Sequence, residues 1–211
     1  MLNINDFWLF AAATLLLNIT PGNDFIYVAT RSLAGGVRAG IISAFGITLG
    51  LFVHVAASVL GLSVILAESA VAFNLLKYAG AAYLAFLGIR MFLGKAKAIG
   101  SEDLMEREKS STFTLLRQGF FTNVFNPKVA LFFISFLPQF ADAGSPRFTE
   151  QLFILGLWFI FSGTLVSITV ALLFGKLRNV LSSVPLFWKL QQKFTGLILV
   201  LLGLKIAMEK K

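Results

Sequence analysis

The sequence predicts an all-α integral membrane protein: six transmembrane helices in two inverted three-helix repeats, with helices 1 and 4 broken at proline. Composition is the first observation, because hydrophobic residues make up 57% and charged residues 13% of the chain, against roughly 45–50% and 25% in soluble domains. The second observation is a set of uncharged apolar stretches long enough to cross a bilayer. The third is an internal repeat with a proline at related positions.

The residue types also exclude several kinds of site. The chain has no cysteine and one histidine, which excludes disulfides, zinc-thiolate sites, cysteine nucleophiles and all-histidine metal clusters. We therefore expect neither a metal nor a cofactor. The net charge of +8 is expected on loops at a membrane face rather than at a nucleic-acid site, because basic loops flank membrane spans.

Six spans account for the apolar stretches. They are Phe7 to about Thr30, Ala39 to Leu66, Ala70 to Leu93, about Gly119 to Phe140, Leu152 to Phe174, and about Phe194 to Met208. The segment before the first span has no Lys or Arg, so we expect that span to be a retained helix and not a cleaved signal peptide.

Basic residues predict the orientation of the spans. Twelve of the 18 Lys and Arg residues fall on the face that receives the loops after spans 1, 3 and 5, Arg31 among them, and five fall on the opposite face. The positive-inside tendency places the twelve in the cytoplasm and both termini outside it. The chain is expected to form one transmembrane domain, 1–211, with repeat one at about 1–93, a cytoplasmic loop at about 94–118 and repeat two at about 119–211.

The two repeats are visible in the third and sixth spans. Lys77 to Gly80 followed by Leu87-Gly88 matches Lys193 to Gly196 followed by Leu202-Gly203. An odd number of spans in each repeat makes the second copy enter the membrane from the opposite side. Inverted repeats with one interrupted helix in each half are typical of secondary transporters. The breaks at Pro21 and Pro127 free backbone groups, so a shared polar cavity is predicted where the halves meet.

Asp24 and Lys128 are the two charges expected deep in the membrane, one from each half. A charge at that depth costs at least about 2.5–3.5 kcal/mol unless it is paired or hydrated. They could receive the ammonium and carboxylate of a zwitterion, or they could form a permanent ion pair that ties the halves together. The predicted substrate-binding residues cluster at the two breaks: Asp24, Lys128, Asn18, Thr20, Gly22, Asn23, Asn123 and Asn126.

Two further features lie in the second span. His54 is, with Asp24, one of two candidate proton carriers, since the unperturbed pKa of histidine, about 6.5, lies near working pH. A hydrogen-bonded packing role for His54 is the alternative. Gly46 and Gly50 have the G-x-x-x-G spacing that permits close contact between helices.

Motifs along nearly the whole chain resemble the LysE/RhtB family of amino-acid exporters. They lie at Pro21 to Asp24, Arg31 to Gly40, Leu76 to Gly88, Gln118 to Lys128 and Phe136 to Phe140. The resemblance implies an inner-membrane exporter of small amino acids or their derivatives, with threonine-like and homoserine-like substrates, driven by the proton gradient. Asn23 departs from the pattern, because members often have a second proline there.

A membrane-embedded enzyme acting on a lipid or polyprenyl substrate is the alternative reading, with Asp24, His54 and Lys128 as acid, base and anion binder. Such enzymes usually carry several acids or histidines at an interface, so an enzyme is not expected. The expected partners are an amino-acid substrate and the lipid bilayer, without nucleic acid. Small glycine-rich helix faces are compatible with a homodimer.

Overall fold

The computed structural model describes residues 6–62 and 110–176, together with single residues between 71 and 93 and between 193 and 204. The elements in the two continuous ranges are all helical. The expected spans Ala70 to Leu93 and Phe194 to Met208 lie outside these ranges, apart from the single residues. The same is true of the repeated Lys77 and Lys193 motifs, except for a few residues such as Tyr78 and Lys193 itself.

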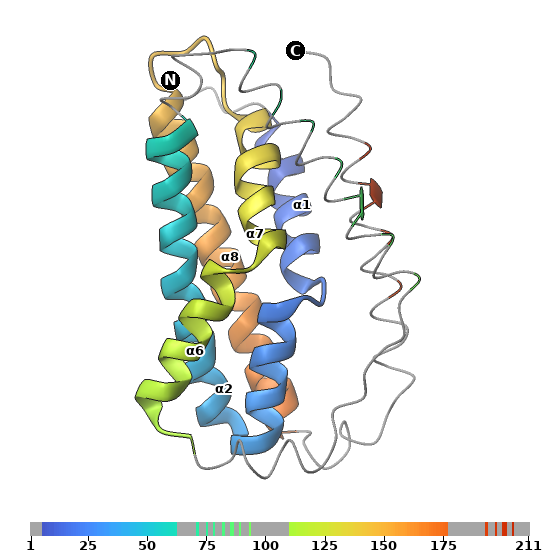
Figure 1. Cartoon of the computed structure of the whole chain (residues 1–211), viewed down its shortest axis with the longest axis vertical. Coiled ribbons are helices and arrows are strands. Elements are labelled where there is room, and N and C mark those ends of the chain that lie inside the picture. The colour runs from blue at the N-terminus through green and yellow to red at the C-terminus, as the bar shows by residue number, and fades with distance from the viewer. Residues whose placement is uncertain are drawn as a thin grey trace.

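The first expected span is broken where the sequence predicts it. Helix α1, Phe7–Ile19, ends before Pro21, and helix α2, Asn23–Ala57, begins after Gly22. Figure 1 shows α1 and the first part of α2 following one another down the molecule, with the break at about mid-height.

Helix α2 turns back on itself at Gly36. The φ of Gly36 is +71°, a conformation that favours glycine because it has no Cβ. After this turn the chain climbs beside its own first part (Figure 1), and a Cβ on Gly40 would collide with the side chain of Ser32. Gly36 therefore divides α2 into a first arm, 23–35, and a second arm, 37–57, which continues into the π-helical turn Ser58–Leu62.

Placing Arg31 in the loop after the first span was wrong. The structure puts Arg31 inside the first arm of α2, with 7% of its surface exposed. The span ends at the fold-back glycine rather than at the first basic residue, because the turn needs a positive φ that Gly36 provides.

The fourth expected span is broken too. Helix α6, Thr112–Val124, is followed by α7, Pro127–Leu131, a π-helical turn at Phe132–Phe136 and a 3₁₀ turn at Leu137–Phe140. The helices before and after the break are bent by 44°. In Figure 1 this chain climbs while α1 and the first arm of α2 descend, so the two broken helices run in opposite directions.

Helix α6 begins earlier than the sequence analysis expected. Its first residue is Thr112, so the end of the predicted loop at 94–118 is helical. The Ser111 side chain caps this helix by accepting a hydrogen bond from the backbone N–H of Thr114 at 3.2 Å. The remainder of that loop, up to residue 109, lies outside the described residues.

Helix α8, Phe148–Lys176, is the long apolar helix predicted for the fifth span. It and α2 are each apolar and long enough to cross a membrane, and the bent pair formed by α6 and the segment Pro127–Phe140 could make a third span. These helices bury two apolar clusters. One joins α1, the segment Pro127–Phe140, the second arm of α2 and the first half of α8 through residues such as Phe10, Phe132 and Phe159. The other joins both arms of α2 to the end of α8 through residues such as Val28 and Phe174.

The second arm of α2 packs closely on α6 through glycines, as the spacing of Gly46 and Gly50 predicts. A Cβ on Gly46 would lie 2.5 Å from the Leu116 carbonyl oxygen, and a Cβ on Gly119 would lie 2.8 Å from that of Ser43. These neighbours are backbone atoms, which cannot move aside as a flexible side chain would. The contact fixes the height at which α6 ends beside α2.

Gly119→Ala should therefore lower the stability of the protein by about 1–3 kcal/mol, the usual cost of forcing an extra methyl into a tight contact. Thermal unfolding in detergent measures the effect. Gly61→Ala is the matched control, because a Cβ there would meet no atom within 4 Å. Equal melting temperatures for the two variants would contradict the close packing of α2 on α6.

Candidate functional site

The break in the first helix leaves a backbone carbonyl without its helical partner. In a continuous helix the N–H of residue 21 would bond the carbonyl of Leu17, but Pro21 has no N–H. The chain after Leu17 ends the helix with a bond from the Thr20 N–H to the Leu16 carbonyl, at 3.0 Å. The carbonyls of Leu17 and Thr20 are thus available at the end of α1.

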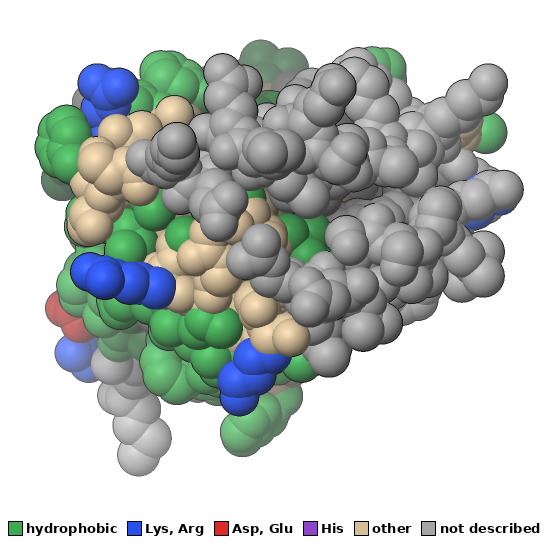
Figure 2. Space-filling view, turned by 90° about the horizontal axis from the view of Figure 1, so that it is seen from below, with side chains coloured by type: hydrophobic (Ala, Val, Ile, Leu, Met, Phe, Trp, Pro, Cys, Tyr) green, Lys and Arg blue, Asp and Glu red, His purple; other side chains and the backbone are tan. Residues whose placement is uncertain are grey.

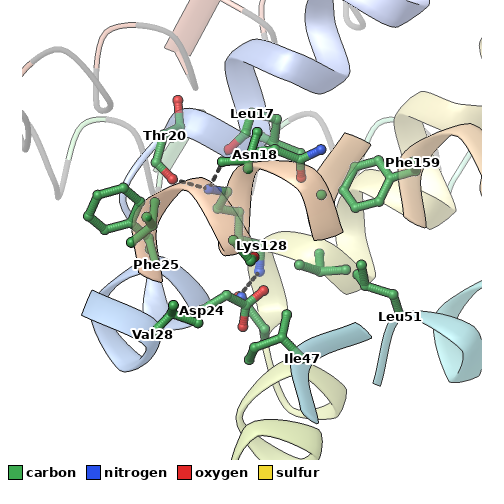
Figure 3. Close-up of a pocket in the computed structure, with 17 residues that line it drawn as sticks. Leu17, Asn18, Thr20, Asp24, Phe25, Val28, Ile47, Leu51, Lys128 and Phe159 are labelled. Atoms are coloured by element: carbon green, nitrogen blue, oxygen red, sulfur yellow. Dashed lines mark hydrogen bonds between the residues drawn. The ribbon is translucent and has the colours of Figure 1, made fainter. Parts of the chain in front are cut away.

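Lys128 binds these carbonyls from the other broken helix. Its Nζ donates to the carbonyl oxygen of Leu17 at 2.9 Å and to that of Thr20 at 2.8 Å. Figure 3 shows the lysine reaching across the cavity to both. The C-terminal end of a helix carries partial negative charge, so an ammonium is favoured there. Gly22 leaves room for the lysine, since a Cβ at that position would lie 3.3 Å from Lys128 Cδ and Nζ.

Asp24, in the first broken helix, is bound by the second broken helix. It lies in the first turn of α2, where the helix N-terminus favours a negative charge. The side-chain amide of Asn123 donates to Asp24 Oδ2 at 2.8 Å. Asn123 belongs to the break of the second helix. Each break therefore supplies neutral polar groups that hold the charge of the other.

Asp24 and Lys128 do not form a direct ion pair in this structure. Among the described residues, an ion pair forms on the surface instead, between Arg147 and Glu150 at 2.8 Å. The two deep charges face a common cavity but are bonded by separate neutral groups: backbone carbonyls accept from Lys128, and the Asn123 amide donates to Asp24 Oδ2. Asp24 Oδ1 is buried without a hydrogen-bond partner. The arrangement does not correspond to a permanent ion pair between the halves.

His54 is attached to the second break. Pro127 lacks the N–H that would bond the Asn123 carbonyl, and this carbonyl accepts from His54 Nε2 at 3.0 Å and from the Asn126 N–H at 2.8 Å. The imidazole stacks on Phe133, with ring centroids 5.8 Å apart. His54 is thus a hydrogen-bonded residue of the core. Asn123 connects it to Asp24, because the Asn123 carbonyl bonds His54 and the Asn123 side chain bonds Asp24.

The cavity between these groups is small. Its volume is about 30 Å³, room for roughly two water molecules at about 10–15 Å³ each. An amino acid does not fit, so the described conformation is closed around the site. The cavity lies between the two apolar clusters, and the Thr20 hydroxyl oxygen in its wall is buried without a hydrogen-bond partner.

Most of the predicted binding residues line this cavity. The wall contains Asn18, Thr20, Gly22, Asp24, Asn126 and Lys128. Asn123 hydrogen-bonds Asp24 but is not part of the cavity wall. Asn23 is exposed and lies outside the wall, because it precedes Asp24 by one residue and a helix turns neighbouring side chains about 100° apart.

Sequence reasoning missed the contribution of α8. Phe159, Gly163 and Ser167 complete the cavity wall, and the Ser162 hydroxyl accepts from the Asn18 side-chain amide at 3.1 Å. Small and polar residues recur between Ser162 and Ser167 inside an otherwise apolar span. That local departure from apolar composition was the available signal for a cavity-lining segment.

Known proteins resemble this chain over most of its length. The model of the LysE type translocator family matches residues 15–210. The homoserine/homoserine lactone efflux protein of Salmonella typhi is 32% identical over 203 residues, covering 95% of this chain and 96% of the relative. Its namesake in Salmonella typhimurium is 35% identical over 152 residues, covering 71% of each chain. The uncharacterized membrane protein YrhP of Bacillus subtilis is 31% identical over 207 residues, covering 90% of this chain and 92% of the relative. No solved structure matches the chain.

Proposed function

The chain belongs to the LysE type translocator family, and from that premise we propose that it exports a small amino acid or derivative from the bacterial cytoplasm. Its similarity to bacterial membrane and efflux proteins, together with its long apolar helices, supports a multi-pass bacterial membrane protein. The proposed substrate is homoserine-like or threonine-like, and the proposed driving force is the proton gradient. The proposed process moves the substrate without changing it chemically.

The proposed architecture is the six-span inverted repeat with both termini in the periplasm. Two features of the described helices support it. The two broken helices run in opposite directions (Figure 1), and the breaks exchange side chains reciprocally, with Lys128 on the first break and Asp24 on the second. Inverted repeats of secondary transporters place such interrupted helices at a shared site near the midplane.

The observation that carries the proposal is the separate binding of two opposite charges in one cavity. The carbonyls of Leu17 and Thr20 already hold an ammonium, that of Lys128. A substrate ammonium is chemically equivalent and could take this position beside Asp24. Lys128 would then be released to bind the substrate carboxylate. Each charge of the zwitterion would exchange one partner for another, which avoids the large cost of an unpaired charge in the bilayer.

The cavity must enlarge before this exchange can occur, since its volume of about 30 Å³ excludes an amino acid. The Asp24–Asn123 hydrogen bond joins the first arm of α2 to α6. Protonation of Asp24 would remove the charge that strengthens this bond. We propose that proton binding at Asp24 and substrate binding alternate there, with His54 holding the backbone of Asn123.

Proteoliposomes test the function directly. The purified chain should catalyse counterflow of labelled homoserine or threonine, and an imposed proton gradient should drive net efflux. A panel of the twenty amino acids with homoserine and homoserine lactone defines the substrate. Absence of transport for the whole panel, with correctly inserted protein, would contradict the proposal.

A further inference from the structure

A second, larger cavity opens between the first arm of α2 and α6. Its volume is about 610 Å³, and Tyr27, Arg31, Arg117, Gln118, Phe121 and Thr122 line it. Small-molecule sites typically measure about 300–1,000 Å³, so this cleft has room for an amino acid where the central cavity has not. Tyr27 and Arg31 lie in the first arm of α2, between the break at Gly22 and the fold-back at Gly36. Figure 2 shows the end of the molecule at which α2 folds back, where Lys and Arg side chains lie at several points of the surface.

The cleft lies next to the central cavity. Asp24, Tyr27 and Arg31 follow one another at spacings of three and four residues, which places them on one face of the α2 first arm. On α6, Thr122 in the cleft wall precedes Asn123, the residue bonded to Asp24. Tyr27 is one helical turn from Asp24, about 4.5 Å along the axis at 1.5 Å per residue. The Asp24–Asn123 hydrogen bond thus stands between the cleft and the cavity.

The wall of the cleft suits a carboxylate. Two guanidinium groups line it, and none of the described residues in its wall is acidic. Arg31 is buried and fixed: it donates to the hydroxyl of Ser110 at 3.0 Å and to the side-chain carbonyl of Gln118, with its guanidinium 5.5 Å from the centre of the Tyr27 ring. Arg117 is exposed. A guanidinium binds a carboxylate through two parallel hydrogen bonds, which makes arginine well suited to this recognition.

We propose that this cleft is the inner binding site of the exporter, where the carboxylate of the substrate binds Arg117 before the substrate reaches the central cavity. The proposal rests on the proposed function, because it assigns the site to a transported amino acid. Arg31, Gln118 and Tyr27 form the fixed wall of the site. Opening of the Asp24–Asn123 bond would connect the cleft to the carbonyls that hold Lys128.

Homoserine and homoserine lactone separate this proposal from a general effect of surface charge, because the lactone has an ammonium but no carboxylate. In vesicles with the inner face accessible, Arg117→Gln should raise the KM for homoserine about tenfold, the loss expected for one charge-assisted contact. The maximal rate for homoserine and the KM for the lactone should stay within about twofold of the parent. Arg117→Lys should restore most of the affinity. Arg147→Gln is the matched control, an exposed arginine that pairs with Glu150.

Equal rises in KM for homoserine and the lactone would overturn the proposal, as would an unchanged KM for homoserine or an equal effect of Arg147→Gln.

A second measurement, thiol labelling, does not depend on transport. The chain has no cysteine, so Thr122→Cys gives a single thiol in the cleft that an impermeant anionic thiol reagent should label from the inner face. Homoserine should slow this labelling and the lactone should not.

Labelling that homoserine leaves unchanged would overturn the inner site even if the protein transports homoserine. Protection by homoserine in a chain that transports nothing would support the site and contradict the proposed function. Labelling from the outer face alone would place the cleft on the opposite side of the membrane and overturn its role as an inner site. The two proposals therefore fail by different results.

Discussion

Lys128→Met should abolish efflux, with a fall of at least about 100-fold, while the protein remains inserted. The Lys128 ammonium makes two bonds to backbone carbonyls at the end of α1, and each hydrogen bond to a charged group contributes about 1.5–3 kcal/mol. In the proposed cycle the same ammonium receives the substrate carboxylate. Methionine keeps a long flexible side chain but can do neither. Efflux from loaded proteoliposomes measures the loss.

Asp24→Asn should abolish proton-coupled efflux with little effect on folding. Asparagine keeps the shape of the side chain and an oxygen that can accept from Asn123, but it loses the negative charge and the site for a proton. Thermal unfolding of each single variant shows whether the protein stays folded. Arg147→Gln, which changes a charge on the exposed surface, controls for an effect of net charge alone.

The double variant distinguishes a binding site from a structural tie. If Asp24 and Lys128 only neutralised one another, each single change would leave a lone buried charge, and changing both would restore stability and transport. The structure shows the two charges held by different neutral partners, so the double variant should be as inactive as the singles. A double variant that transports like the parent would refute the substrate-binding role.

The breaks at Pro21 and Pro127 could be predicted from the sequence because the effect of proline is local: it removes one N–H at a known position. The partners of the freed carbonyls could not be predicted. Lys128 lies 111 residues from Leu17, and His54 lies 69 residues from Asn123. Which side chain reaches which carbonyl depends on how the helices pack.

Helix ends were harder to predict than helix breaks. Arg31 was assigned to a loop because basic residues usually mark the end of a span. The helix continues past it, because Ser110 and Gln118 accept hydrogen bonds from its guanidinium inside the protein. The chain turns only at Gly36, where φ is positive. Asn23 was grouped with Asp24 by proximity in the chain, but the helix directs the two side chains differently. Polar composition predicted which segments line the cavity, and helical geometry decides which of their side chains do so.

Pro21→Ala should impair transport at least tenfold while leaving the melting temperature unchanged or higher. Alanine supplies the missing N–H at residue 21, which can bond the Leu17 carbonyl within a continuous helix. That N–H competes with the Lys128 ammonium for the same oxygen, now 2.9 Å away. The helix gains a regular turn, and the cavity loses one of its two carbonyls. Substrate affinity and efflux, measured in the same proteoliposomes, should therefore fall together.

Pro127→Ala should act at the other break, where the new N–H competes with His54 for the Asn123 carbonyl. Because Asn123 holds Asp24, this change should weaken proton coupling more than substrate binding. Pro138→Ala is the matched control: Pro138 is a buried proline of the 3₁₀ segment Leu137–Phe140, and it is absent from the cavity wall. Loss of membrane insertion in Pro21→Ala or Pro127→Ala, without a selective loss of transport, would make these prolines structural and would remove the freed carbonyls from the mechanism.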